Sequence, residues 1–173
     1  NGSFRRPCGV SKEGYRMMKV QTGKLVACLK TLGFKPNMQN FSERKKVQKL
    51  IYLIQEVARI PLGFDFSWYH HGPYSPGLTK VLFELEEGKV PTDEILSKSE
   101  VERLNALKVF LREDMPSADN LELLGSLHYL FQAAKRFGVK EEEAYRVLKI
   151  KKPYFSDSEI EKAGKKLRLA ENF

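Results

Sequence analysis

Apolar residues recur three and four positions apart along most of this 173-residue chain, which is the spacing of helices that bury one face. The pattern predicts seven helices, beginning near residues 19, 42, 76, 99, 119, 141 and 156. Gly33, Gly88 and Gly138 follow three of the apolar stripes and are typical helix ends. There is no internal repeat, so the helices are expected to form a single domain.

Short polar residues mark several of the predicted helix starts. Ser42 and Asp119 are predicted N-caps, because their side-chain oxygens can accept bonds from the first free backbone N–H groups. Ser75-Pro76 combines a cap with proline at the first helical position. The pairs Ser99–Glu102 and Ser156–Glu159 have the spacing of a capping box.

One segment has the period of a strand. In Phe64–Tyr69, apolar rings alternate with polar or exposed positions, and the segment ends in a turn that contains His70-His71-Gly72. A lone strand is unstable, so a partner is expected from Lys89–Pro91 or Leu62–Gly63. The fold class predicted is mainly α, a single domain of about seven helices with a small β-hairpin or ribbon element.

The first residues lack either pattern. Residues 1–16 include Gly2, Pro7, Gly9 and Gly14, and helical periodicity begins only after Met17-Met18. We therefore expect residues 1–18 to be an unstructured or non-native N-terminal extension, and residues 19–173 to be the helical domain.

Composition places the chain among ordinary globular proteins, at 42% hydrophobic and 30% charged residues. No apolar run approaches the length of about 20 residues that crosses a bilayer, so no membrane association is expected. Cys8 and Cys28 are too few for a disulfide framework or a metal cage, which indicates a reducing compartment and a cytoplasmic location. No metal or cofactor is expected.

The net charge of +8 suggests a nucleic-acid partner, but its distribution weakens that argument. Residues 36–134 hold 11 basic and 14 acidic side chains, so the centre of the chain is slightly acidic. The basic excess lies toward the two ends.

The densest cluster of chemically versatile side chains runs from Trp68 to Ser75. His70 or His71 could serve as a general base, with Ser75 as its nucleophile. Adjacent histidines on a strand face opposite sides and so are poorly placed to share a metal ion. Ser75 is already needed as a helix cap, and no glycine loop of the oxyanion type accompanies it. The cluster is therefore predicted to be a structural or binding turn, with no catalytic residue.

A second cluster places Arg44, Lys45, Lys46 and Lys49 at the start of a helix. Positive charge there opposes the helix dipole, at a cost of a few tenths of a kcal/mol up to about 1 kcal/mol for each side chain. A bound phosphate or the carboxylates of a partner would offset this cost. An ordinary solvated face is the alternative.

Two stretches, RKKVQKLIYL at 44–53 and FSWYHHGPYS at 66–75, together resemble the YwgA-like family of uncharacterised prokaryotic proteins. The later segments LLGSLHYL at 123–130 and KPYFS at 152–156 are also similar to that family. More distantly, a basic helix followed by a Gly-Pro turn resembles the phage-associated, antitoxin-like Panacea domain. The resemblance implies a non-catalytic partner that neutralises a toxin or acts as an adaptor, with no catalytic residues to carry over.

The function predicted from the sequence is a non-catalytic protein-interaction module, antitoxin-like or an adaptor, that binds another protein. The residues predicted to contact that partner, or an anion, are Arg44, Lys45, Lys46, Lys49, Trp68, Tyr69, His70, His71, Tyr74 and Ser75. The alternative is a regulatory nucleic-acid-binding protein that uses its basic helix residues, and a homodimer is compatible with either function. A hydrolase or nuclease based on His70 or His71 would require a carboxylate within hydrogen-bonding reach of the imidazole.

Overall fold

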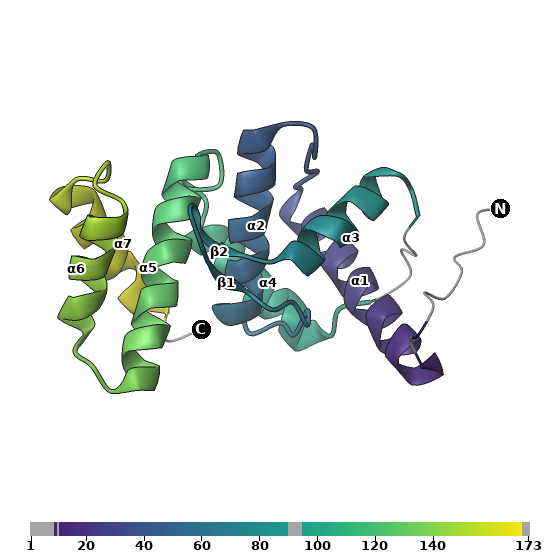
Figure 1. Ribbon diagram of the computed structural model, residues 1–173. Coiled ribbons are helices and arrows are strands. Elements are labelled where there is room, and N and C mark those ends of the chain that lie inside the picture. Colours follow the sequence, from purple (N-terminus) through teal and green to yellow (C-terminus); the bar gives the residue numbers. More distant parts are fainter. Residues whose placement is uncertain (1–8, 10, 90–94, 171–173) are drawn as a thin grey trace.

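The computed structural model describes residue 9, residues 11–89 and residues 95–170 (Figure 1). Within them the chain forms seven helices and one two-stranded antiparallel sheet, so the predicted fold class is confirmed. The elements are α1 (Lys12–Leu32), α2 (Phe41–Glu56), β1 (Ser67–Tyr69), β2 (Gly72–Tyr74), α3 (Pro76–Glu86), α4 (Lys98–Phe110), α5 (Ala118–Phe137), α6 (Glu141–Lys151) and α7 (Asp157–Ala170). In the described part of the chain, no helix has the length and apolar character needed to cross a membrane.

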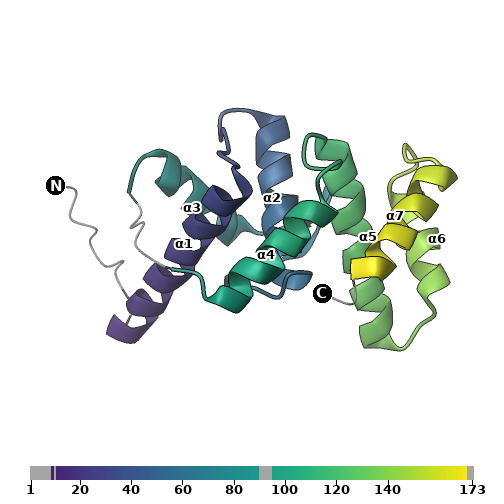
Figure 2. The same cartoon turned by 180° about the vertical axis from the view of Figure 1, so that it is seen from behind.

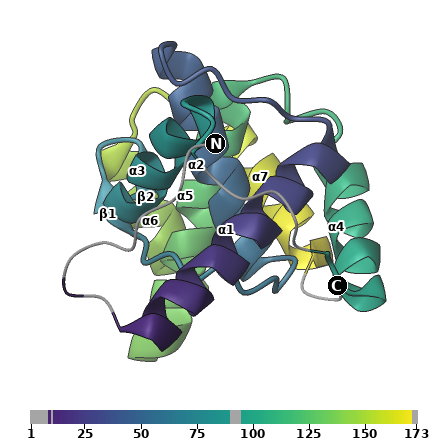
Figure 3. The ribbon, with the colours of Figure 1, turned by 90° about the vertical axis from the view of Figure 1, so that its right-hand side faces the viewer.

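Helix α5 is the central element. It packs against α2 on one side and against α6 and α7 on the other, and β2 lies on both α5 and α2 (Figure 1). From behind, α4 crosses the molecule beside α1, and α7 lies next to α6, to which the ion pair between Arg168 and Glu141 links it (Figure 2). The view along the molecule from the α1 side places the hairpin and α4 on opposite sides of α2 (Figure 3). Helix α2 itself packs against α5 and β2 and contacts α3.

The core follows from that position of α2. All eight residues from Val47 to Ile54 are buried, including the polar Gln48 and Lys49. Leu50, Ile51 and Leu53 have no exposed surface, and each stabilises the fold by about 1.5–3 kcal/mol through burial. A helix that is buried nearly all round must satisfy its polar side chains internally, which determines the chemistry described below.

Three helices begin before the predicted caps. Asn40 caps α2 through its Oδ1, which accepts from the Glu43 N–H at 3.1 Å, and Ser117 caps α5. The capping box of α4 is Ser97 with Glu100. The predictions of Ser42, Asp119 and Ser99–Glu102 are therefore wrong by two residues each, because a suitable cap stood one half-turn upstream.

The other start signals are confirmed. The Ser75 hydroxyl accepts from the Leu78 N–H at 3.3 Å, with Pro76 at the first helical position. Ser156 and Glu159 exchange side-chain and backbone bonds ahead of α7.

Helix α1 begins at Lys12, with Ser11 as its cap, rather than at Lys19. Residues 12–18 are helical, so the unstructured alternative for residues 1–18 is wrong for them, while the alternative of a non-native extension stays a prediction. Residues 1–8 and 10 of the predicted extension lie outside the described residues.

The strand partner differs from both predicted candidates. Gly72–Tyr74 pairs with Ser67–Tyr69, and His70-His71 forms the two-residue turn between them. Leu62–Gly63 and Lys89 are not in strands, while Val90 and Pro91 lie outside the described residues. Gly72 allows this arrangement because its φ is +81° and a Cβ there would lie 2.1 Å from the Ser126 Oγ on α5. Only glycine lets the hairpin lie this close to the helix.

Candidate functional site

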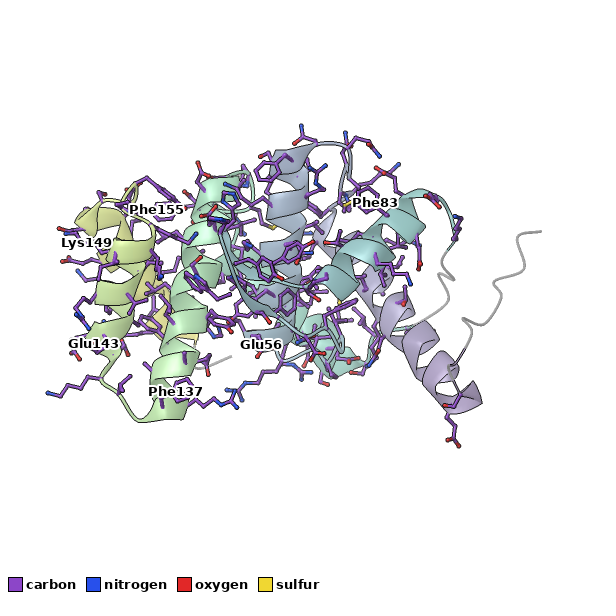
Figure 4. All side chains as sticks on the ribbon, in the orientation of Figure 1. Glu56, Phe83, Phe137, Glu143, Lys149 and Phe155 are labelled. Atoms are coloured by element: carbon purple, nitrogen blue, oxygen red, sulfur yellow. The ribbon has the colours of Figure 1, made fainter. Side chains whose placement is uncertain are left out.

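The start of α2 and the hairpin meet around one cavity of about 300 Å³, which we call the hairpin pocket. Helix α3 closes its third side with Thr79 and with Phe83, which is labelled in Figure 4. Two segments separated by about twenty residues in the sequence thus form a single concave site. Seven of the ten predicted binding residues line it: Arg44, Lys45, Lys49, Tyr69, His70, His71 and Tyr74.

The other three predicted residues have different surroundings. Lys46 pairs with Glu43 at 2.9 Å and lies 6.0 Å from the Phe34 ring centroid. Trp68 packs against Tyr129, behind the pocket. Ser75 is buried as the cap of α3.

Gln48 attaches the end of the hairpin to α2. Its Nε2 donates to the Ser75 carbonyl at 3.0 Å and to the Thr79 hydroxyl at 2.8 Å, and its Oε1 accepts from the Ser75 N–H at 3.0 Å. Every polar atom of this buried amide therefore has a partner. No local pattern indicates this role, since an isolated glutamine in an amphipathic helix is usually a surface residue.

Beneath the pocket, the Glu122 carboxylate of α5 is the centre of a polar network. Its Oε1 accepts bonds from the Lys152 Nζ at 2.6 Å and from the Tyr154 hydroxyl. Its Oε2 lies 3.0 Å from the Lys45 Nζ and 3.1 Å from the His71 Nδ1. Burial alone would raise the pKa of Glu122, but the bonds from Lys152, Tyr154 and Lys45 outweigh it and lower the pKa to about 2. The carboxylate is therefore ionised at neutral pH.

Two lysines of the network hold the hairpin by its backbone. Lys152, which is 1% exposed, donates to the His70 carbonyl at 2.8 Å, and burial lowers its pKa against the opposing effect of Glu122. Lys49, which is 2% exposed, donates to the Pro73 carbonyl at 2.7 Å, and burial lowers its pKa to about 7. Each lysine thus supplies a donor to one end of the His70–Pro73 segment.

The carboxylate that a histidine-based hydrolase would require is present for one of the two histidines. His71 contacts Glu122, whereas no such contact to His70 occurs in the described residues. However, the Glu122 oxygens are shared with two lysines and a tyrosine, and the Ser75 hydroxyl is committed to its cap. In the described residues, no group of three or more His, Cys, Asp or Glu side chains is placed to hold a metal ion.

The third histidine, His128 on α5, lies away from the pocket. Its Nδ1 lies 2.9 Å from the Tyr52 hydroxyl, and burial lowers the pKa of the imidazole to about 4. Tyr52 is itself almost fully buried in α2, so this pair is part of the α2–α5 contact.

Comparison with protein-family models, with curated proteins and with solved structures gives no match for this chain. The resemblance to the YwgA-like family and to the Panacea domain stays a prediction.

Proposed function

We propose that this domain is a non-catalytic protein-interaction module, antitoxin-like or an adaptor, and that the hairpin pocket and its rim contact the partner. One observation carries the proposal: three cationic side chains and several aromatic rings converge on a single cavity, while the nearby histidine lacks an available nucleophile. Such a set of groups is suited to recognition.

The rim of the pocket has the composition of a protein interface. Phe41 and Tyr69 are 57% and 52% exposed and line the same cavity, so two aromatic side chains are presented together at its rim. The Phe41 ring packs edge-on against His71, and the Arg44 guanidinium lies 5.7 Å from the Phe41 ring centroid. Exposed aromatic residues beside arginine are the side chains most often found at the energetic centres of interfaces.

The nucleic-acid alternative has less support from the geometry. Lys45 and Lys46 pair with carboxylates of the domain, and Lys49 is buried against the Pro73 carbonyl. Of the basic residues at the start of α2, only Arg44 is therefore both unburied and without an anionic partner in the described chain. The first turn of α6 carries Glu141, Glu142 and Glu143, which would repel phosphates.

The test is affinity capture from an extract of the source organism with the Phe41→Ala/Tyr69→Ala variant. The wild type should retain a partner protein after nuclease treatment, and the purified partner should bind again. The amount captured by the variant should be at least about tenfold smaller, because each aromatic anchor typically contributes about 1.4 kcal/mol or more to binding. Phe137→Ala is the matched control, since Phe137 is 75% exposed at the far end of α5 (Figure 4).

Circular dichroism would establish that both variants are folded. Equal capture by the wild type and by the folded Phe41→Ala/Tyr69→Ala variant would exclude this surface. Recovery of nucleic acid alone, abolished by nuclease, would favour the alternative function.

A further inference from the structure

The hairpin pocket has positive charge in its walls with no acidic residue among them. Arg44, Lys45 and Lys49 line it, and none of its lining residues in the described chain is Asp or Glu. Lys45 has carboxylate partners outside the lining, in Asp119 at 2.6 Å and Glu122 at 3.0 Å. The charges of Arg44 and Lys49 have no such direct partner in the described part of the chain.

Of the two basic residues without a direct carboxylate partner, Arg44 and Lys49, Lys49 is the buried one. Its ammonium group has three N–H donors, and its one hydrogen bond in the described chain goes to the neutral Pro73 carbonyl. Glu122 attracts it from a distance, but Lys45 and Lys152 add positive charge nearby, and burial is the main reason that its pKa is about 7. With a pKa of about 7 the Lys49 amine is only partly protonated at neutral pH, and an anion in the pocket would favour its protonated, cationic form.

Arg44 is the more accessible cation. Its Nη1 donates to the Met38 carbonyl at 2.7 Å, and most of its five guanidinium N–H donors have no partner among the described residues. A planar guanidinium is suited to bind a carboxylate through two parallel bonds.

Much of the remaining wall is apolar or aromatic. It includes Met38, Phe41, Phe83 and the pair Tyr69 and Tyr74, whose rings are tilted at 55° with centroids 5.1 Å apart; Gln48, Thr79 and the two histidines complete the lining. A volume of about 300 Å³ is at the lower end for ligand sites, which suits a group of the size of one large side chain.

Features of the α2 N-terminus disfavour a phosphate. The Asn40 side chain already occupies the Glu43 N–H, and the Glu43 carboxylate lies in the same first turn. The free backbone donors that usually bind phosphate at a helix start are therefore partly occupied and face a negative charge.

We propose that the hairpin pocket binds a carboxylate attached to an aromatic or aliphatic group, with Lys49 as the buried cation and Arg44 as the cation at the mouth. We place this carboxylate in an acidic, hydrophobic segment of the partner protein, and in that respect the inference rests on the proposed function. It goes beyond that function by specifying the chemistry that the partner must present.

The test uses two probes of the same shape, 4-phenylbutyrate and 4-phenylbutyramide, titrated into the isotope-labelled protein and followed by amide chemical shifts. The acid should shift the α2 start and the hairpin, with a dissociation constant at least about tenfold smaller than that of the amide. Equal binding of the two probes, or no shift at these segments, would overturn the proposal. Phenyl phosphate that binds tenfold more tightly than the acid would also overturn it.

Lys49→Met removes the charge but keeps the length of the side chain, and should reduce the preference for the acid to about threefold or less, because Arg44 alone remains. Lys46→Met is the matched control, since Lys46 lies on the same helix outside the pocket, and its preference should equal that of the wild type. An unchanged preference in folded Lys49→Met would contradict the role of Lys49. If that variant does not fold, Arg44→Gln provides the same comparison.

The two proposals fail in different ways. Preference for the acid without any captured protein would support the carboxylate site and assign it to a free small acid, against the protein-interaction function. Capture that depends on Phe41 and Tyr69, without preference for the acid, would overturn only the carboxylate inference.

Discussion

At the scale of single residues, the Glu122 side chain connects several separate parts of the fold. It is 1% exposed, and its two oxygens accept from or pair with residues of α2, the hairpin turn and the chain after α6. Without its charge, Lys152 would be a buried cation without an ionic partner, which is far more costly than the loss of a surface ion pair.

We therefore predict that Glu122→Gln lowers the free energy of unfolding by about 3–5 kcal/mol, as measured by urea denaturation at pH 7. Glu143→Gln removes an exposed carboxylate that pairs with Arg146 at 2.6 Å, and should cost less than about 1 kcal/mol. Similar midpoints for the two variants would show that the network contributes little to stability.

The sequence predicted the residues of the pocket better than those of the network. Basic and aromatic side chains that are clustered along the chain can be recognised locally, and seven of them proved to share a cavity. Glu122 is a single charge within the apolar segment LELLGSL, and Lys152 follows other lysines in KIKK, so each resembles a surface residue. Their pairing depends on how α5 and α6 pack, which periodicity does not specify.

At the scale of elements, the start of α4 shows why predicted boundaries were displaced. Ser97–Glu100 and Ser99–Glu102 both have capping-box spacing, and local sequence does not choose between them. Glu100 also forms an ion pair with Lys24 of α1 at 2.5 Å, which fixes the first register through a tertiary contact.

Ser97→Ala should therefore lower the free energy of unfolding by about 1 kcal/mol, because the Glu100 N–H loses its acceptor. Ser99→Ala should change it by less than about 0.5 kcal/mol, since Ser99 lies inside the helix. Thermal denaturation of both variants gives the comparison, and the reverse order of stabilities would place the helix start at the later serine.

The helices themselves could be predicted because the apolar spacing of three and four residues repeats over several turns in each of them. The second strand could not, because Gly72-Pro73-Tyr74 resembles a helix-breaking turn when read alone. Its strand structure depends on lysine donors and on α5 beneath it, all of which are remote in sequence.

At the scale of the whole molecule, the stability should depend on acid through His128. Burial lowers the pKa of its imidazole from 6.5 to about 4 in the folded state. Between these two values the unfolded chain binds more protons than the folded one, so stability is lost as the pH falls from about 6.5 to about 4.

We expect this effect to reach up to about 3 kcal/mol, measured as the free energy of unfolding at pH 7, 5 and 4. His128→Gln should be less stable at pH 7 but should show a smaller change across this interval. An equal pH dependence in the variant would assign the acid sensitivity to other groups. From pH 4.5 down to about 2 the loss should continue, because the Glu122 carboxylate takes up a proton in the unfolded chain while the folded state keeps it ionised.

The way in which the hairpin is held has a further consequence. Lys49 and Lys152 bind backbone carbonyls, at Pro73 and His70, and Gln48 binds the backbone of Ser75. The side chains of His70 and His71 at the tip are exposed, so the shape of the turn does not depend on them alone. The same scaffold can therefore display different side chains at position 70, whereas position 71 also contacts Glu122 and Phe41. Changes in partner preference can accumulate at position 70, by natural divergence or in an engineered library, without redesign of the fold.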